Sequence, residues 1–195
     1  MKTKFTIAVI LLILVMPFRS DAQDVALKTN LLYDATLTVN IGGEIAVAPR
    51  WSIDLSGNFN GWTLDDARRW KHWLVQPELR YWLCYAMGGH FFGIHALGGQ
   101  YNVGHIHNSV KFLGTDFSGL TDQRYQGWAV GAGIAYGYSW MLGKHWNVEA
   151  EIGIGYAYTK FDVYECAGCG KKTQTDRHHN YFGPTKAAVN IIYVF

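Results

Sequence analysis

The end of the sequence limits most strongly what this chain can fold into. In residues 184–195 the apolar side chains recur at every second position, and the last of them closes the sequence with an aromatic ring. A period of two places these side chains on one face of a β-strand and more polar residues on the other face. The apolar positions are Ala187, Val189, Ile191, Tyr193 and Phe195.

A strand of this kind is typical of the closing strand of a bacterial outer-membrane β-barrel. The barrel-assembly machinery recognises such a terminal aromatic residue, so this machinery is a predicted partner. The face with Val189, Ile191, Tyr193 and Phe195 is expected to contact outer-membrane lipid. Lys186 and Asn190 are expected to point into the barrel.

Composition favours strands in a membrane. Charged residues make up 16% of the 195 residues and aromatic residues 15%, whereas soluble domains usually have about 25% charged residues. The shortfall indicates that much of the exterior does not face water, yet no internal run approaches the ~20 apolar residues of a membrane helix. In lipid only helices and closed barrels satisfy every backbone group, which leaves a barrel. The net charge of +2 gives no reason to expect a nucleic-acid partner.

Turns and strand-like segments alternate along the whole chain. Short turns at Pro49, Gly88-Gly89 and Gly143 alternate with more variable connections, which is the pattern of periplasmic turns and outer loops. We therefore predict an all-β fold, an eight-stranded antiparallel up-and-down transmembrane β-barrel with both ends in the periplasm. The predicted strands are 25–34, 40–48, 51–60, 71–86, 91–103, 126–141, 145–164 and 184–195. The predicted variable connections are 35–39, 63–70, 104–125 and 165–180.

Residues 1–22 have the features of a cleaved signal peptide. Two lysines begin the segment, an apolar core follows over residues 5–15, and Ser20-Asp21-Ala22 offers a small-x-small cleavage site. The apolar core is too short for an anchor helix, which is the alternative interpretation. The predicted domains are therefore a signal peptide at 1–22 and the barrel at 23–195, located in the bacterial outer membrane.

The polar face of the predicted strands carries charges of both signs. If the apolar face meets lipid, these charges point into the barrel, where we expect a network of ion pairs because an unpaired buried charge is costly. An eight-stranded barrel is filled by its side chains, which argues against a diffusion pore; a proton or ion path along the carboxylates is the alternative. A soluble lipocalin-like barrel, with its apolar face inward, is a second alternative for the whole fold. The inward charges are Lys28, Glu44, Asp54, Glu78, Arg80, Glu149, Glu151 and Lys186.

Two cysteines and two histidines lie in the predicted last outer loop. Cys166 and Cys169 form a CxxC pair, and His178 and His179 follow. A disulfide that braces the loop is the favoured interpretation in an oxidising compartment, with zinc binding or free thiols as alternatives. Cys84 is expected to be a small buried residue on the polar face of its strand. No residue is assigned as a metal or cofactor ligand.

The longest predicted loop begins with His105, His107 and Ser109. Small outer-membrane lipid hydrolases place a serine and a histidine near the barrel rim, so a lipid- or envelope-modifying enzyme is an alternative function. A catalytic pair also needs hydrogen-bond geometry and an orienting group, and the sequence has no GxSxG elbow. We interpret these residues as solvated loop residues and assign no catalytic residue.

Three stretches carry a family resemblance: LKTNLLYDA at 27–35, WSIDLS at 51–56 and WLVQPELRYW at 73–82. They resemble the uncharacterised family known as domain of unknown function 3575, for which KTNLLYD and QPELRYW are the most specific marks. The resemblance covers essentially the whole mature chain and implies a small outer-membrane barrel of anaerobic gut-type bacteria. Family genes often accompany fimbrial or other surface-assembly genes, which implies a role at the cell surface and a surface or fimbrial protein partner. The CxxC loop is not a feature of the family.

The sequence thus predicts a non-enzymatic outer-membrane barrel that is a structural, anchoring or assembly component of a fimbria-like surface system, without cofactor. The alternatives are an envelope-modifying enzyme and a soluble ligand-binding barrel.

Overall fold

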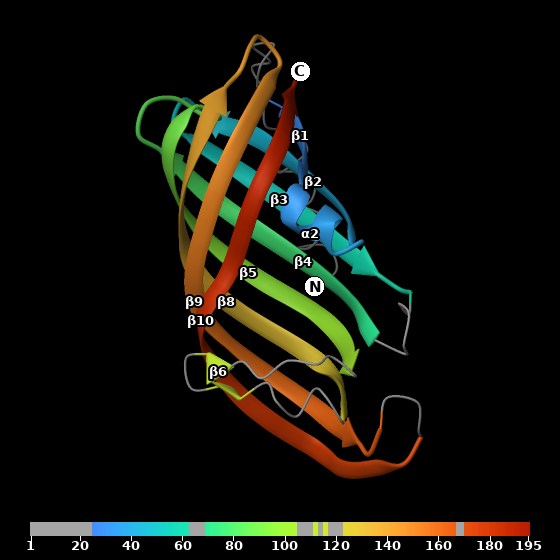
Figure 1. The fold of residues 1–195 in the computed structure, drawn as a ribbon. Helices are drawn as coiled ribbons and strands as arrows, with labels where there is room; N and C mark the ends of the chain where they lie inside the picture. The colour runs from blue at the N-terminus through green and yellow to red at the C-terminus, as the bar shows by residue number, and fades with distance from the viewer. Residues whose placement is uncertain (1–24, 63–68, 105–110, 113–114, 117–122, 167–169) are drawn as a thin grey trace, which may run out of the picture.

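The computed structural model describes residues 25–62, 69–104, 111–112, 115–116, 123–166 and 170–195. Within these residues, eight antiparallel strands form one ring in chain order, and the ring closes where the first strand pairs with the last (Figure 1). The predicted eight-stranded up-and-down barrel is confirmed. Its strands are β1 (Val25–Asn30), β2 (Val39–Ala48), β3 (Trp51–Asn60), β4 (Arg69–Trp82), β5 (Gly89–Gly104), β8 (Arg124–Met141), β9 (Trp146–Tyr164) and β10 (Lys172–Val194).

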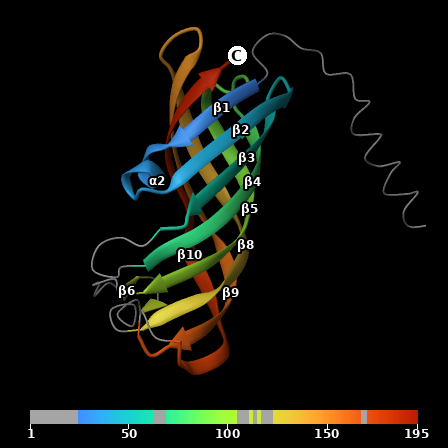
Figure 2. The same ribbon diagram turned by 90° about the vertical axis from the view of Figure 1, so that its right-hand side faces the viewer.

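The two ends of the barrel differ. One end, which we call the short-turn end, has the tight connections 49–50, 83–88 and 142–145, and there the backbone N–H of Phe195 donates to the carbonyl oxygen of Val25. The opposite end, the loop end, has the longer connections and the two-stranded hairpin β6 (Lys111–Phe112) and β7 (Thr115–Asp116). The wall is much taller on the β8–β10 side than on the β1–β3 side, so the rim of the loop end is slanted (Figure 2).

The predicted first strand, 25–34, is wrong in its second half. β1 ends at Asn30, and the short helix α2 (Leu31–Ala35) follows. The Asn30 side chain caps this helix by accepting from the backbone N–H of Leu32 at 3.1 Å. It also donates to the carbonyl oxygen of Ala187 and accepts from the N–H of Val189 on β10. One side chain therefore takes over the pairing with β10 at the point where the backbone of β1 turns away.

The predicted loop 165–180 is also wrong, because most of it belongs to β10. This strand begins at Lys172 and pairs with β9 through two register shifts before the regular ladder starts near Arg177. Residues 172–178 are exposed on both faces of the strand. Since neither face is buried, the segment has no alternating apolar pattern and reads as a loop in the sequence.

Polar side chains face the interior of the barrel, and apolar side chains face outward. On β3, Ser52 and Asp54 are 0% and 1% exposed, while Ile53 and Leu55 are 49% and 54% exposed. The same alternation continues on β10, where Lys186 and Asn190 are buried as predicted. The two faces are therefore reversed relative to a protein with an oily core and a polar exterior.

Apolar side chains close the interior at the short-turn end. The rings of Trp82 and Phe91, both fully buried, lie 4.6 Å apart. A small cluster of Ala26, Met87, Ile192 and Val194 completes this closure. Cys84 does not contribute to it: β4 already ends at Trp82, so the strand alternation does not reach Cys84, which is exposed. The prediction that Cys84 is buried was wrong for this reason.

Candidate functional site

The eight charged residues predicted to point inward come together inside the barrel. All eight are buried, with exposed fractions of 8% or less. We call them the interior charge cluster. Its members are Lys28 on β1, Glu44 on β2, Asp54 on β3, Glu78 and Arg80 on β4, Glu149 and Glu151 on β9, and Lys186 on β10.

Arg80 is the centre of the cluster. Its Nη1 lies 2.9 Å from Oε2 of Glu44 and 3.0 Å from Oε2 of Glu149. Its Nη2 lies 2.7 Å from Oε2 of Glu151, and its Nε lies 3.4 Å from Oε1 of Glu78. The guanidinium group thus reaches carboxylates on three strands, which a lysine ammonium with a single nitrogen cannot do.

Lys28 joins the acidic groups of β2 and β3. Its Nζ lies 2.5 Å from Oε2 of Glu44 and 2.7 Å from Oδ2 of Asp54. The other oxygen of Glu44 accepts a hydrogen bond from the Ser52 hydroxyl, which in turn accepts one from Nε1 of Trp82. The charges are therefore extended into a hydrogen-bonded network that reaches the apolar closure of the short-turn end.

Lys186 joins the acidic groups of β4 and β9, and a bulge in β10 brings it there. Its Nζ contacts the Glu78 carboxylate and lies 3.1 Å from Oε1 of Glu151. Pro184 interrupts the ladder with β9, and the register shifts before Lys186. The extra residue, Thr185, also meets the interior, because its hydroxyl lies 2.8 Å from Nε2 of buried His95.

Strand register explains why so many cations are needed. Glu44, Asp54 and Glu78 lie directly opposite one another on three adjacent strands. Like charges in this position destabilise a sheet unless cations lie between them. The next residues around the ring are His95 and Gly133. A side chain at Gly133 would meet His95, since an added Cβ would lie 2.9 Å from its Cε1. Glycine at this position therefore relieves crowding around His95.

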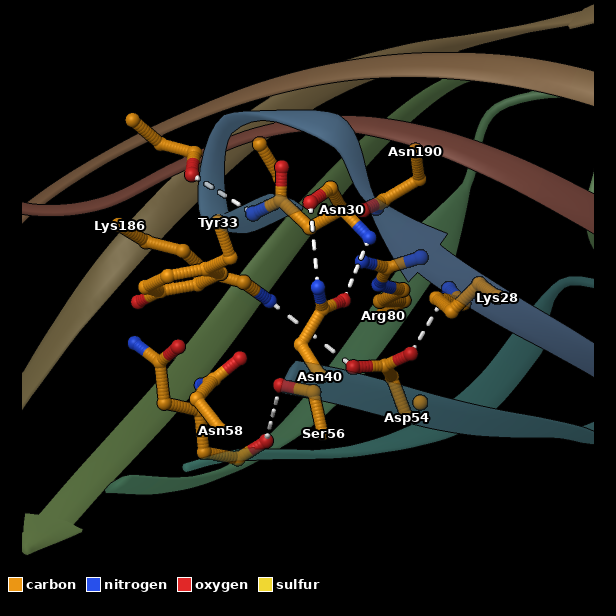
Figure 3. A pocket seen from close by; sticks show the side chains of 14 residues that line it. Lys28, Asn30, Tyr33, Asn40, Asp54, Ser56, Asn58, Arg80, Lys186 and Asn190 are labelled. Atoms are coloured by element: carbon orange, nitrogen blue, oxygen red, sulfur yellow. Dashed lines mark hydrogen bonds and ion pairs between the residues drawn. The ribbon is translucent and has the colours of Figure 1, made fainter. Parts of the chain in front are cut away.

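The cluster leaves little open space. The cavity beside it is about 20 Å³, which is room for about one water molecule. Figure 3 shows Lys28, Asp54, Arg80 and Lys186 pointing into it, with Tyr33 of α2 covering one side. The filled interior and the apolar closure at the short-turn end agree with the prediction that the barrel is not a diffusion pore. The alternative, a path for protons or ions along the carboxylates, stays a prediction.

The outward face carries a second feature, which we call the apolar band. It consists of the outward side chains between two bracketing aromatic residues on a strand: Trp51 and Phe59 on β3, Trp73 and Tyr81 on β4, Trp128 and Trp140 on β8, and Trp146 and Tyr156 on β9. The outward positions between these brackets hold no charged residue. Charged side chains return beyond the band, for example Lys160 and Asp162 at the loop end and Lys144 at the short-turn end.

The other residues singled out in the sequence do not form a site in the described part of the chain. Cys166 is disulfide-bonded, while Cys169 lies outside the described residues. His178 is on β10, where its ring stacks parallel to that of Tyr158 at 6.3 Å. The described ranges contain no group of three or more His, Cys, Asp or Glu placed to hold a metal ion. His105, His107 and Ser109 fall outside these ranges, as do residues 1–22, for which a signal peptide is predicted.

Comparison with known proteins identifies the family. The family model described as "protein of unknown function (DUF3575)" matches residues 7–195, nearly the whole chain. The chain belongs to this family. No curated protein and no solved structure matches it. None of the described helices is long and apolar enough to cross a membrane.

The family marks and the interior charge cluster coincide. KTNLLYD provides Lys28, Asn30 and Tyr33, and QPELRYW provides Glu78 and Arg80, all of which line or form the cluster. About half of the residues in these two stretches therefore face the interior, while Leu31, Leu32 and Leu79 are exposed. Sequence reasoning missed three interior residues: Tyr33, whose segment reads as a strand, and Trp82 and Phe91, of which Trp82 shares the strand parity of Arg80.

Proposed function

We propose that this DUF3575 protein is a non-enzymatic outer-membrane β-barrel that serves as an anchoring or assembly component of a fimbria-like surface structure. The observation that carries the proposal is the apolar band around a charged, filled interior. In water this arrangement would expose far more contiguous apolar surface than a soluble monomer tolerates. In lipid the same arrangement is favourable, because every strand pairs with two neighbours and no sheet edge is left open.

The dimensions of the band support a membrane location. Trp51 and Phe59 are eight residues apart, Trp146 and Tyr156 ten, and Trp128 and Trp140 twelve. At about 3.3 Å per residue these separations correspond to roughly 26–40 Å of strand. A strand tilt of about 40° reduces them to roughly 20–30 Å along the barrel axis, a range that includes the ~25 Å band of outer-membrane barrels with aromatic girdles.

The interior argues against the soluble alternative. A lipocalin-like barrel binds its ligand in an interior lined by apolar residues. Here Glu44, Arg80 and Glu149 are fully buried at the centre, and the cavity beside them is only about 20 Å³. The interior has neither the apolar lining nor the volume for a lipophilic ligand.

The filled interior also favours an anchor over a channel. A barrel packed with ion pairs is a rigid support that holds its loop end in a fixed position. The loop-end segment of β10, residues 172–180, extends beyond the band and presents charged and polar side chains. We propose that this segment and the neighbouring loops contact the surface structure. The fimbrial assignment itself rests on the surface-assembly genes that often accompany DUF3575 genes.

The membrane part of the proposal is tested by fractionation. The full chain, produced in a bacterium with an outer membrane, should be found in the outer-membrane fraction and should require detergent for release. Without boiling, the detergent-solubilised protein should migrate faster on a gel than the boiled protein, as compact barrels do. Release by salt or carbonate alone would refute the membrane location.

The anchoring part is tested by photo-crosslinking in cells of the native host. A photo-reactive amino acid at Arg177, on the exposed segment of β10, should give crosslinks to a surface protein. The matched control places the same amino acid at Ile134, inside the apolar band, where crosslinks to that protein should be absent. Equal crosslinking at both positions, or none at Arg177 and at neighbouring loop-end positions, would contradict the proposed role.

A further inference from the structure

A groove of about 450 Å³ lies on the barrel wall at the loop end, across β3–β5, β8, β9 and β10. Its size is within the range of small-molecule sites. Strand register places two of its rows side by side. Trp73, Gln100 and Trp128 are directly paired in the first row, and Lys71 and Asn102 begin the second.

The first row is the loop-end edge of the apolar band. Trp73 and Trp128 are 44% and 40% exposed, on the same face as the outward residues of the band. Gln100 lies between them and holds Trp73 in place, because its Oε1 accepts a hydrogen bond from the indole Nε1 at 3.2 Å. Two exposed indole rings therefore flank an amide at the boundary between the apolar band and the polar loop end.

The second row is polar, and two of its groups lack partners. Within the described residues the Lys71 ammonium makes no ion pair, and Oδ1 of Asn102 is shielded without receiving a hydrogen bond. Asp162, on the same row, is instead satisfied: the Lys172 ammonium lies 2.6 Å from its Oδ2 and holds the pKa of this carboxyl below its usual value. Because Oδ1 is shielded, the amide of Asn102, which lines the groove, offers its Nδ2 donor to a ligand.

We propose that this groove binds the sugar headgroup of an outer-leaflet glycolipid, an inference that rests on the membrane location proposed above. The groove is continuous with the apolar band, so a lipid whose chains lie against the band brings its headgroup to the second row. The indole rings of Trp73 and Trp128 pack against sugar faces, the Nδ2 of Asn102 donates to a sugar oxygen, and the ammonium of Lys71 meets an anionic group. Aromatic faces beside amides suit sugars, because a sugar has both apolar C–H faces and hydroxyl groups.

The probe for this proposal is lipid A, a phosphorylated disaccharide glycolipid, titrated onto the full barrel in detergent and followed by native mass spectrometry. K71Q should weaken binding about tenfold, the size of one charge-assisted hydrogen bond, and N102A should weaken it in the same direction. The matched control is K144Q, which removes a lysine from the turn after β8 at the opposite end and should leave binding unchanged. Each variant is folded if its unboiled form migrates faster on a gel than its boiled form.

The outcomes separate this inference from the proposed function. Equal lipid A affinity of K71Q, K144Q and the unchanged protein would overturn the headgroup site while leaving the membrane location intact. The deacylated disaccharide should bind more weakly than lipid A. If it competes with lipid A at equal affinity, the groove binds a free glycan, and the proposal of a glycolipid ligand is refuted. Release of the unchanged protein from membranes without detergent would instead refute the membrane location.

Discussion

An arginine in the middle of the apolar band distinguishes a membrane barrel from a soluble one. Ile134 is 63% exposed and lies on β8, six residues from each bracketing aromatic residue, Trp128 and Trp140. In a bilayer this is the midplane, where arginine costs about 2–4 kcal/mol on the lipid face of a barrel. In water the same I134R change would stay within about 0.5 kcal/mol.

The free energy of unfolding is measured by reversible urea titration of the barrel in phospholipid vesicles. I134R should lower the folding equilibrium constant by about 30- to 1,000-fold. The matched control is Q126R on the same strand and face, beyond Trp128, where an interfacial arginine costs about 0–1 kcal/mol.

Equal effects of I134R and Q126R would refute the reasoning. A small effect of both changes would mean that Ile134 faces water. A large effect of both would mean that the two residues lie at the same depth.

Three further predictions follow from the packing and the cysteines. R80M leaves four carboxylates without their shared cation and should cost about 3–5 kcal/mol in a urea titration, with R80K intermediate; an unchanged midpoint would contradict the central role of Arg80. G137A places a Cβ 2.4 Å from an aromatic ring and should cost about 1–3 kcal/mol, whereas G143A, in an open turn, should cost little. In the denatured, unreduced protein a maleimide should label Cys84 at once and Cys166 only after reduction; immediate labelling of Cys166 would disprove the disulfide.

The period-two pattern was sufficient to predict the barrel and the interior charge cluster. On a strand, residues at every second position point to the same face of the sheet. Charged residues that alternate with apolar residues therefore all lie on one face of that strand. The eight inward charges could therefore be named, although their individual partners depend on register and on the bulge at Thr185. A bulge is not visible in the alternation, apart from the signal that Pro184 gives.

The errors occurred where alternation is absent or where a side-chain contact overrides it. Residues 172–178 are polar because both faces of that part of β10 meet solvent. Leu31 and Tyr33 continue the apolar alternation of β1, but the side chain of Asn30 caps a helix there and replaces the backbone pairing. Phe91 was missed as an interior residue because nothing local in the sequence shows that Gly137 leaves space for its ring.

The most direct test of the account is the depth of Ile134 in the membrane. A fluorophore is attached to I134C in a C84S background, without reduction, and the barrel is reconstituted with lipids brominated in mid-chain. The account predicts strong quenching by the brominated lipids and none by aqueous iodide, with the opposite result for a label at D176C on the exposed segment of β10. Quenching of the residue 134 label by iodide but not by brominated lipid would contradict the claim that the apolar band faces lipid.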